Sequence, residues 1–147
     1  MLNIEYFFSR ENLIGNVGYE LGYFKIFDND KIIYDGQQKQ NFMLFLSIPD
    51  ILLDLCELIE SKKQNKETIL ADSSIIICFL NNNDEIEIRI NNNFILRKEK
   101  KEVIKAIYES SKKFIEENMN RIEDSVKSDL NYGLERYKLV MTKNNLL

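Results

Sequence analysis

The sequence predicts an α+β protein: an antiparallel sheet of about five or six strands with two or three helices packed on one face. Three observations favour this class. Residues 1–97 contain short apolar runs separated by Asn- and Asp-rich turns, and residues 98–147 carry apolar residues at helical spacing. One further helical pattern interrupts the first part. The expected order is three strands, a helix, three strands and one or two helices, within one domain covering residues 1–147.

The first three strands are predicted at Ile4–Phe8, Tyr19–Phe27 and Lys31–Asp35. Between the second and third lies Asp28-Asn29-Asp30, a turn by composition, because Asp and Asn tolerate left-handed backbone geometry. Two strands around a short polar turn predict a hairpin. The loop before it contains three glycines, Gly15, Gly18 and Gly22, at a spacing that is not typical of phosphate-binding loops.

The first helix is predicted from Ser47 to Lys63. Ser47 with Asp50 three residues later resembles a capping box, and Pro49 would then stand in the first turn, where it costs no hydrogen bond. Apolar residues follow at the spacing of one helical face: Ile48, Ile51, Leu52, Leu55, Leu58 and Ile59. The preceding apolar run, 42–46, fits a strand or an earlier helical turn, and a strand is favoured.

A meander of three strands is predicted next, at Ser74–Leu80, Glu85–Ile90 and Phe94–Arg97, with Asn-rich turns between them. The period then becomes helical, and one long helix is predicted over Glu99–Lys127. A further helix is expected over Leu130–Met141, after a break near Asn131–Gly133.

Composition excludes several classes of function. The chain has no histidine, two cysteines set in apolar runs and a net charge of −4, with no metal-ligand or nucleophile motif. We therefore expect a non-catalytic protein without cofactor or metal. The sequence pI near 5 disfavours nucleic acid as partner. No signal peptide or membrane-spanning run is visible, so a cytoplasmic protein is expected.

The candidate binding residues are acidic. Asp50, Asp54 and Glu57 share one face of the first predicted helix, and no Lys or Arg occurs between Lys39 and Lys62. Glu85 and Glu87 alternate with isoleucines and should point outward from their strand. Each set is explained either as a solvated face or as a contact surface for a basic protein. Residues 1–97 carry 15 acidic and 9 basic side chains, which favours a basic partner.

The layout resembles immunity proteins of bacterial polymorphic-toxin and contact-dependent inhibition systems. The resemblance rests on the hairpin Tyr23–Asp35, the amphipathic segment Leu46–Asp54, the isoleucine-rich meander and the long C-terminal helix. It implies an inhibitor of a basic, nuclease-like toxin and carries over no binding residue. The alternative is a bacterial regulatory or scaffold protein that forms a homodimer. An enzyme using carboxylate or tyrosine chemistry is a third interpretation, which no spacing selects.

Overall fold

The computed structural model describes residues 1–9 and 19–147, and within them the chain forms two four-stranded antiparallel sheets and three helices. The predicted α+β class is confirmed. The strands differ from the expectation, because eight strands in two sheets replace one sheet of five or six. Gly15 and Gly18 of the predicted glycine-containing loop lie outside the described residues.

The elements follow the predicted order with two added strands. Their bounds are β1 (Leu2–Phe8), β2 (Leu21–Asp28), β3 (Lys31–Asp35), β4 (Phe42–Met43), α1 (Leu44–Glu60), β5 (Asn65–Ile69), β6 (Ile76–Asn82), β7 (Glu85–Ile90), β8 (Asn93–Glu99), α2 (Lys100–Asn118) and α3 (Asp124–Lys143). Short 3₁₀ turns, η2 (Gly36–Gln38) and η3 (Met119–Arg121), complete the described chain.

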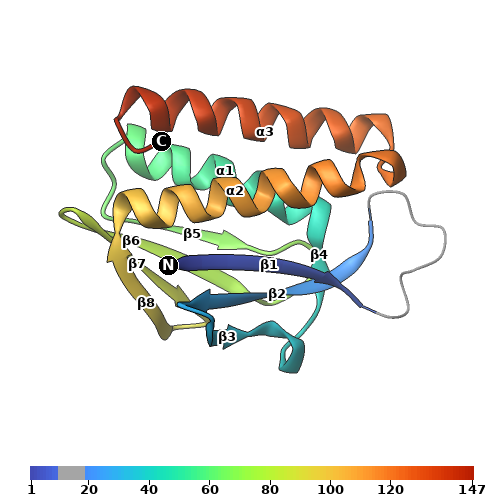
Figure 1. Ribbon diagram of the computed structural model, residues 1–147, viewed down its shortest axis with the longest axis horizontal. Helices are drawn as coiled ribbons and strands as arrows, with labels where there is room; N and C mark the ends of the chain where they lie inside the picture. The colour runs from blue at the N-terminus through green and yellow to red at the C-terminus, as the bar shows by residue number, and fades with distance from the viewer. Residues whose placement is uncertain (10–18) are drawn as a thin grey trace.

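The helices lie together on one side of the molecule and the two sheets on the other (Figure 1). In the first sheet β2 pairs with β1 on one edge and with β3 and β4 on the other, while the second sheet has the order β5-β6-β7-β8. Apolar side chains of both sheets and of α1 and α2 meet in one core, for example Ile26, Ile88, Ile51 and Ile107. The end strands of the two sheets each contact a helix, β1 with α2 and β5 with α1.

The β2–β3 turn confirms the predicted hairpin, because Asn29 and Asp30 both adopt positive φ, at 51° and 68°. Strand β5 was not predicted. Its sequence, Asn-Lys-Glu-Thr-Ile, lacks the apolar alternation that identifies a strand, yet it pairs with β6 in register from Asn65 to Ile69. A polar edge strand gives little periodic signal because only one of its edges is paired and few of its side chains are buried.

Helix α1 begins at Leu44, three residues before the predicted start, so the predicted capping box is wrong. Ser47 is fully buried within the helix, and its hydroxyl accepts a hydrogen bond from the Ala71 N–H at 2.8 Å. The apolar run 42–46 contains both of the structures considered for it. Phe42 and Met43 form the strand β4, and the next residue starts helix α1.

The long C-terminal helix is also divided differently from the prediction. The chain turns at residues 119–123, where Ile122 is extended, and α3 then runs without a break through Gly133. A Cβ on Gly133 would lie 3.4 Å from the Pro49 Cα atom, an ordinary van der Waals distance, so α3 packs directly on α1 at this position. The sequence pattern did not reveal the division, because α2 and α3 each bury an apolar face and their apolar residues follow one another along the chain.

The two tyrosines of α3 have different environments. Tyr137 is completely buried and donates a hydrogen bond from its hydroxyl to the Ile104 carbonyl of α2, at 2.8 Å. Tyr132 is 59% exposed. Tyr137 therefore connects α3 to α2 inside the core.

Across residues 1–9 and 19–147, no helix has the length and apolarity needed to cross a membrane.

Candidate protein-binding surface

Helix α1 places the three predicted carboxylates on the side that faces β5 and solvent. The opposite side of the helix is fully buried at Ile48, Leu52 and Leu55. Because residues four apart share a helical face, Asp50, Asp54 and Glu57 follow one line along α1. The line runs beside β5, which among the described strands pairs with β6 alone.

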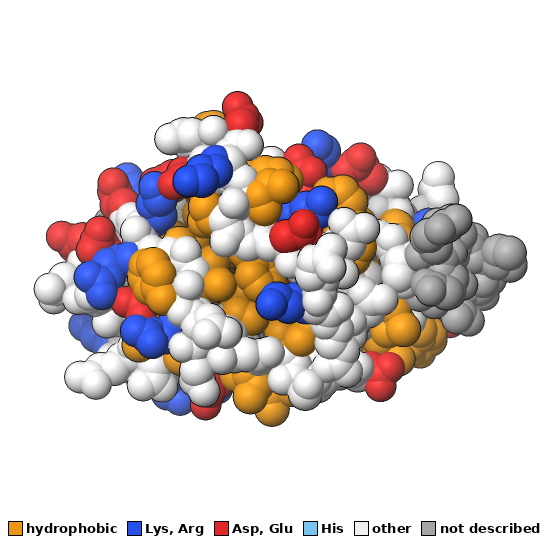
Figure 2. All heavy atoms as spheres, turned by 90° about the horizontal axis from the view of Figure 1, so that it is seen from below, with side chains coloured by type: hydrophobic (Ala, Val, Ile, Leu, Met, Phe, Trp, Pro, Cys, Tyr) orange, Lys and Arg blue, Asp and Glu red, His pale blue; other side chains and the backbone are white. Residues whose placement is uncertain are grey.

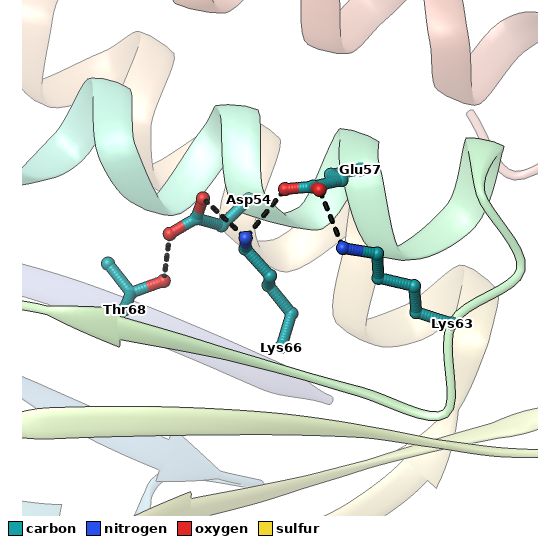
Figure 3. Close-up of polar contacts among 5 residues, drawn as sticks. All are labelled: Asp54, Glu57, Lys63, Lys66 and Thr68. Carbon is teal, nitrogen blue, oxygen red and sulfur yellow. Dashed lines mark hydrogen bonds and ion pairs between the residues drawn. The ribbon is translucent and has the colours of Figure 1, made fainter.

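Asp54 is held by β5. The Thr68 hydroxyl donates a hydrogen bond of 2.6 Å to one carboxylate oxygen, and the Lys66 ammonium lies 4.0 Å from the other (Figure 3). Partial burial raises the pKa of Asp54, while the Thr68 hydrogen bond and Lys66 oppose that rise. Asp54 is thus a carboxylate with internal partners rather than a solvated one.

Glu57 forms two ion pairs. Lys63, in the turn after α1, lies 2.7 Å from one carboxylate oxygen, and Lys66 of β5 lies 2.6 Å from the other (Figure 3). Hydrogen bonds from Lys63 and Lys66 lower the pKa of Glu57 to about 2. The sequence contained this signal, because both lysines follow the helix closely, but the expectation of an unneutralised stripe considered only residues up to Lys62.

Asp50 differs from its two neighbours on α1. Its side chain is exposed and makes no ion pair within 4.0 Å among the described residues. Partial burial and the negative charge of Asp54 raise the pKa of Asp50. Asp50 is consequently a carboxylate whose ionised form would be stabilised by an added cation.

The two glutamates of β7 also differ from each other. Glu85 is exposed at the start of the strand, opposite Glu99 of β8. Glu87 is only 4% exposed, because Arg97 and Arg89 cover it. The Arg97 guanidinium lies 2.8 Å from the Glu87 carboxylate, and the pKa of Glu87 is lowered by hydrogen bonds from Arg97 and Arg89. The expectation that Glu87 faces solvent is therefore wrong. Its side chain does point away from the core, as the strand alternation predicted.

The structure does not bring the five carboxylates into one cluster. Glu87 is in register with Leu80 of β6, which is in register with Asn65 of β5. Two strand spacings, about 10 Å, therefore separate Glu87 from the strand that borders α1. Asp50, Asp54 and Glu57 form one acidic surface along α1, and Glu85 and Glu87 lie on the outer face of the second sheet.

Neither surface has the geometry of a metal site. In the described part of the chain, no group of three or more His, Cys, Asp or Glu side chains is arranged to hold a metal ion. Both cysteines are free thiols, and burial raises the pKa of Cys56 to about 11. Burial also raises the pKa of Cys78, which lies on β6. What the arrangement offers chemically is fixed negative charge, exposed at Asp50 and Glu85.

No family model, curated protein or solved structure matches this chain.

Proposed function

We propose that the protein is a non-catalytic binding module, an immunity or inhibitor protein that neutralises a basic, nuclease-like toxin through its acidic surface. The observation that supports this most directly is Asp50. It is exposed, it makes no ion pair among the described residues, and its pKa is raised by partial burial and by Asp54. A cationic side chain from a partner would relieve that repulsion.

The remaining carboxylates act in two ways in this proposal. Glu85 contacts the partner directly, because it is exposed and makes no ion pair among the described residues. Asp54, Glu57 and Glu87 already bind lysine or arginine, so a basic partner reaches them by exchanging with these internal cations. Their negative field also speeds the encounter with a positively charged protein.

The test starts with recovery of partners from the native cells at low and at moderate salt, identified by mass spectrometry. A recovered basic protein is then purified, assayed for nuclease activity and titrated with the wild-type chain. The D50N/E85Q double variant should weaken inhibition by about tenfold and reduce its salt dependence. Both substitutions leave the internal ion pairs of Asp54, Glu57 and Glu87 intact.

Glu135→Gln is the matched control, because Glu135 is an exposed carboxylate on α3, and it should leave inhibition unchanged. A partner without toxic activity would contradict the immunity function. An inhibited toxin that binds D50N/E85Q as tightly as the wild type would contradict the acidic surface.

The alternative function is a homo-oligomeric regulatory or scaffold protein. Figure 2 supports it, because hydrophobic side chains gather at the centre of the face opposite the helices. Two large apolar side chains on the strands are also exposed, Ile32 of β3 by 47% and Phe94 of β8 by 57%. Sedimentation of the wild type and of I32K/F94K distinguishes the two functions. A dimer that dissociates in this variant supports the scaffold, and a monomeric wild type excludes it.

A further inference from the structure

One backbone edge of strand β1 pairs with no other described strand. The Ser9 N–H donates to the Leu21 carbonyl at 3.0 Å, and the Met1 carbonyl accepts from the Asn29 N–H at 3.1 Å. The backbone N–H and C=O groups of the odd-numbered residues therefore point toward β2. The Leu2 N–H points the other way, to a Glu102 carboxylate oxygen of α2 at 3.1 Å. Because antiparallel ladders alternate, the backbone groups of Ile4 and Tyr6 also face away from β2.

No described strand pairs with that edge, and a groove runs along it. Helix α2 lies beside β1 (Figure 1), and between them is a groove of about 370 Å³. Ile4, Tyr6, Ser110 and Phe114 line the groove. Its remaining side chains come from the two elements on either side: Asn3, Glu5, Glu109, Lys113 and Glu117. Unpaired backbone donors and acceptors next to a groove are the features that recognise an extended peptide.

Contacts at both ends of β1 limit the length of this edge. Glu102 occupies the Leu2 N–H at one end. At the other end the Arg121 guanidinium lies over the Phe8 ring, 4.5 Å from its centre. From Ile4 to Phe8 the strand extends about 14 Å, which corresponds to about five residues of added strand.

The charged side chains of the groove indicate the kind of peptide. Three carboxylates, Glu5, Glu109 and Glu117, accompany one cation, Lys113, and none of them makes an ion pair within 4.0 Å among the described residues. This differs from α1, where Lys63 and Lys66 form ion pairs with Asp54 and Glu57. An extended segment with Lys or Arg side chains would place positive charge among these carboxylates.

We propose that the groove between β1 and α2 binds an extended, Lys- or Arg-containing segment of a partner protein as an added strand. The segment pairs with the backbone of Ile4 and Tyr6, and its cationic side chains bind Glu5, Glu109 and Glu117. This site is independent of the α1 surface, since no residue is shared between them.

The experiment uses the full chain and a displayed library of linear peptides of about ten residues in which Lys or Arg alternates with Val, Ile or Thr. Selected peptides should slow hydrogen exchange of the Ile4 and Tyr6 amides, measured by NMR. E5Q/E109Q/E117Q should weaken binding by about tenfold. The control D50N/E85Q, which alters α1 and β7, should leave peptide affinity unchanged.

Backbone N-methylation of a selected peptide separates strand addition from simple charge attraction. Methyl groups on alternate residues should abolish binding in one register, whose N–H groups pair with β1, and preserve it in the other. The proposal is overturned if the library yields no binder, if exchange at Ile4 and Tyr6 is unaffected, or if both registers bind equally.

Discussion

Two junctions between a helix and an edge strand carry carboxylate side chains, and they are built differently. At the α1–β5 junction, Lys66 and Thr68 of the strand bind Asp54 and Glu57 of the helix. At the α2–β1 junction the groove carboxylates make no ion pair among the described residues, and only the Leu2 N–H binds a helix carboxylate, that of Glu102.

The difference comes from the strands rather than from the helices. Helix α1 has no basic residue and helix α2 has several, so helix composition alone suggests that α1 is the less neutralised of the two. Strand β5 supplies Lys66 and Thr68, whereas β1 carries Glu5 and no lysine or arginine. The ion pair of Asp54 and one of the two ion pairs of Glu57 therefore come from the strand that lies beside the helix.

The largest expected effect is the loss of the contact between Asp54 and Thr68. Thr68→Val keeps the shape of the side chain and removes its hydroxyl, which donates a hydrogen bond of 2.6 Å to the partly buried Asp54 carboxylate. We expect the free energy of unfolding to fall by about 1.5 kcal/mol in urea denaturation. Thr142→Val, at an exposed position of α3, should change it little. Equal stability of T68V and wild type would show that the junction is not held by this bond.

Acid should weaken the α1–β5 junction selectively. The pKa of Glu57 is lowered to about 2 from 4.5, so its ion pairs stabilise the fold above about pH 4.5 and are lost as the pH falls toward 2. When denaturation midpoints are measured at several pH values in this range, they should fall more steeply with decreasing pH for the wild type than for E57Q. Asp50 and Asp54 have raised pKa values and act in the opposite direction, so the comparison with E57Q is required. Parallel curves would contradict the assigned pairing.

The α2–β1 junction should depend less on its single carboxylate contact. Glu102→Ala removes the acceptor of the Leu2 N–H, and we expect a loss of about 0.5–1 kcal/mol together with faster hydrogen exchange at Leu2. Glu109→Ala, on the same helix, is the control and should change neither quantity, because the Glu109 side chain makes no hydrogen bond or ion pair among the described residues. Unchanged exchange at Leu2 in E102A would show that the contact does not protect the strand.

The smallest expected effect on the free energy of unfolding is an increase rather than a decrease. Asp50 has a raised pKa because of partial burial and of Asp54, so Asp50→Asn should stabilise the fold at neutral pH by a few tenths of a kcal/mol. Asp129→Asn, at an exposed position of α3, is the control in the same denaturation experiment. A destabilised D50N would mean that Asp50 has a stabilising partner, and the proposed contact would lose its main support.

The candidate surface was only partly predictable from the sequence. Helical spacing placed Asp50, Asp54 and Glu57 on one face, and strand alternation directed Glu87 away from the core face. Neither pattern contains the cations that cover these carboxylates. Glu87 pairs with Arg97, ten residues later, only because β7 and β8 align them in register.

The fold shows the same division. The class, the β2–β3 hairpin and the apolar helix faces follow from the sequence, because periodicity and turn chemistry act between residues a few positions apart. The tertiary structure decided the split into two sheets, the recruitment of polar β5 and the turn before α3. It also decided which carboxylates are neutralised. These outcomes depend on distances between elements that are far apart along the chain, as where Gly133 packs on Pro49, and no local pattern encodes such distances.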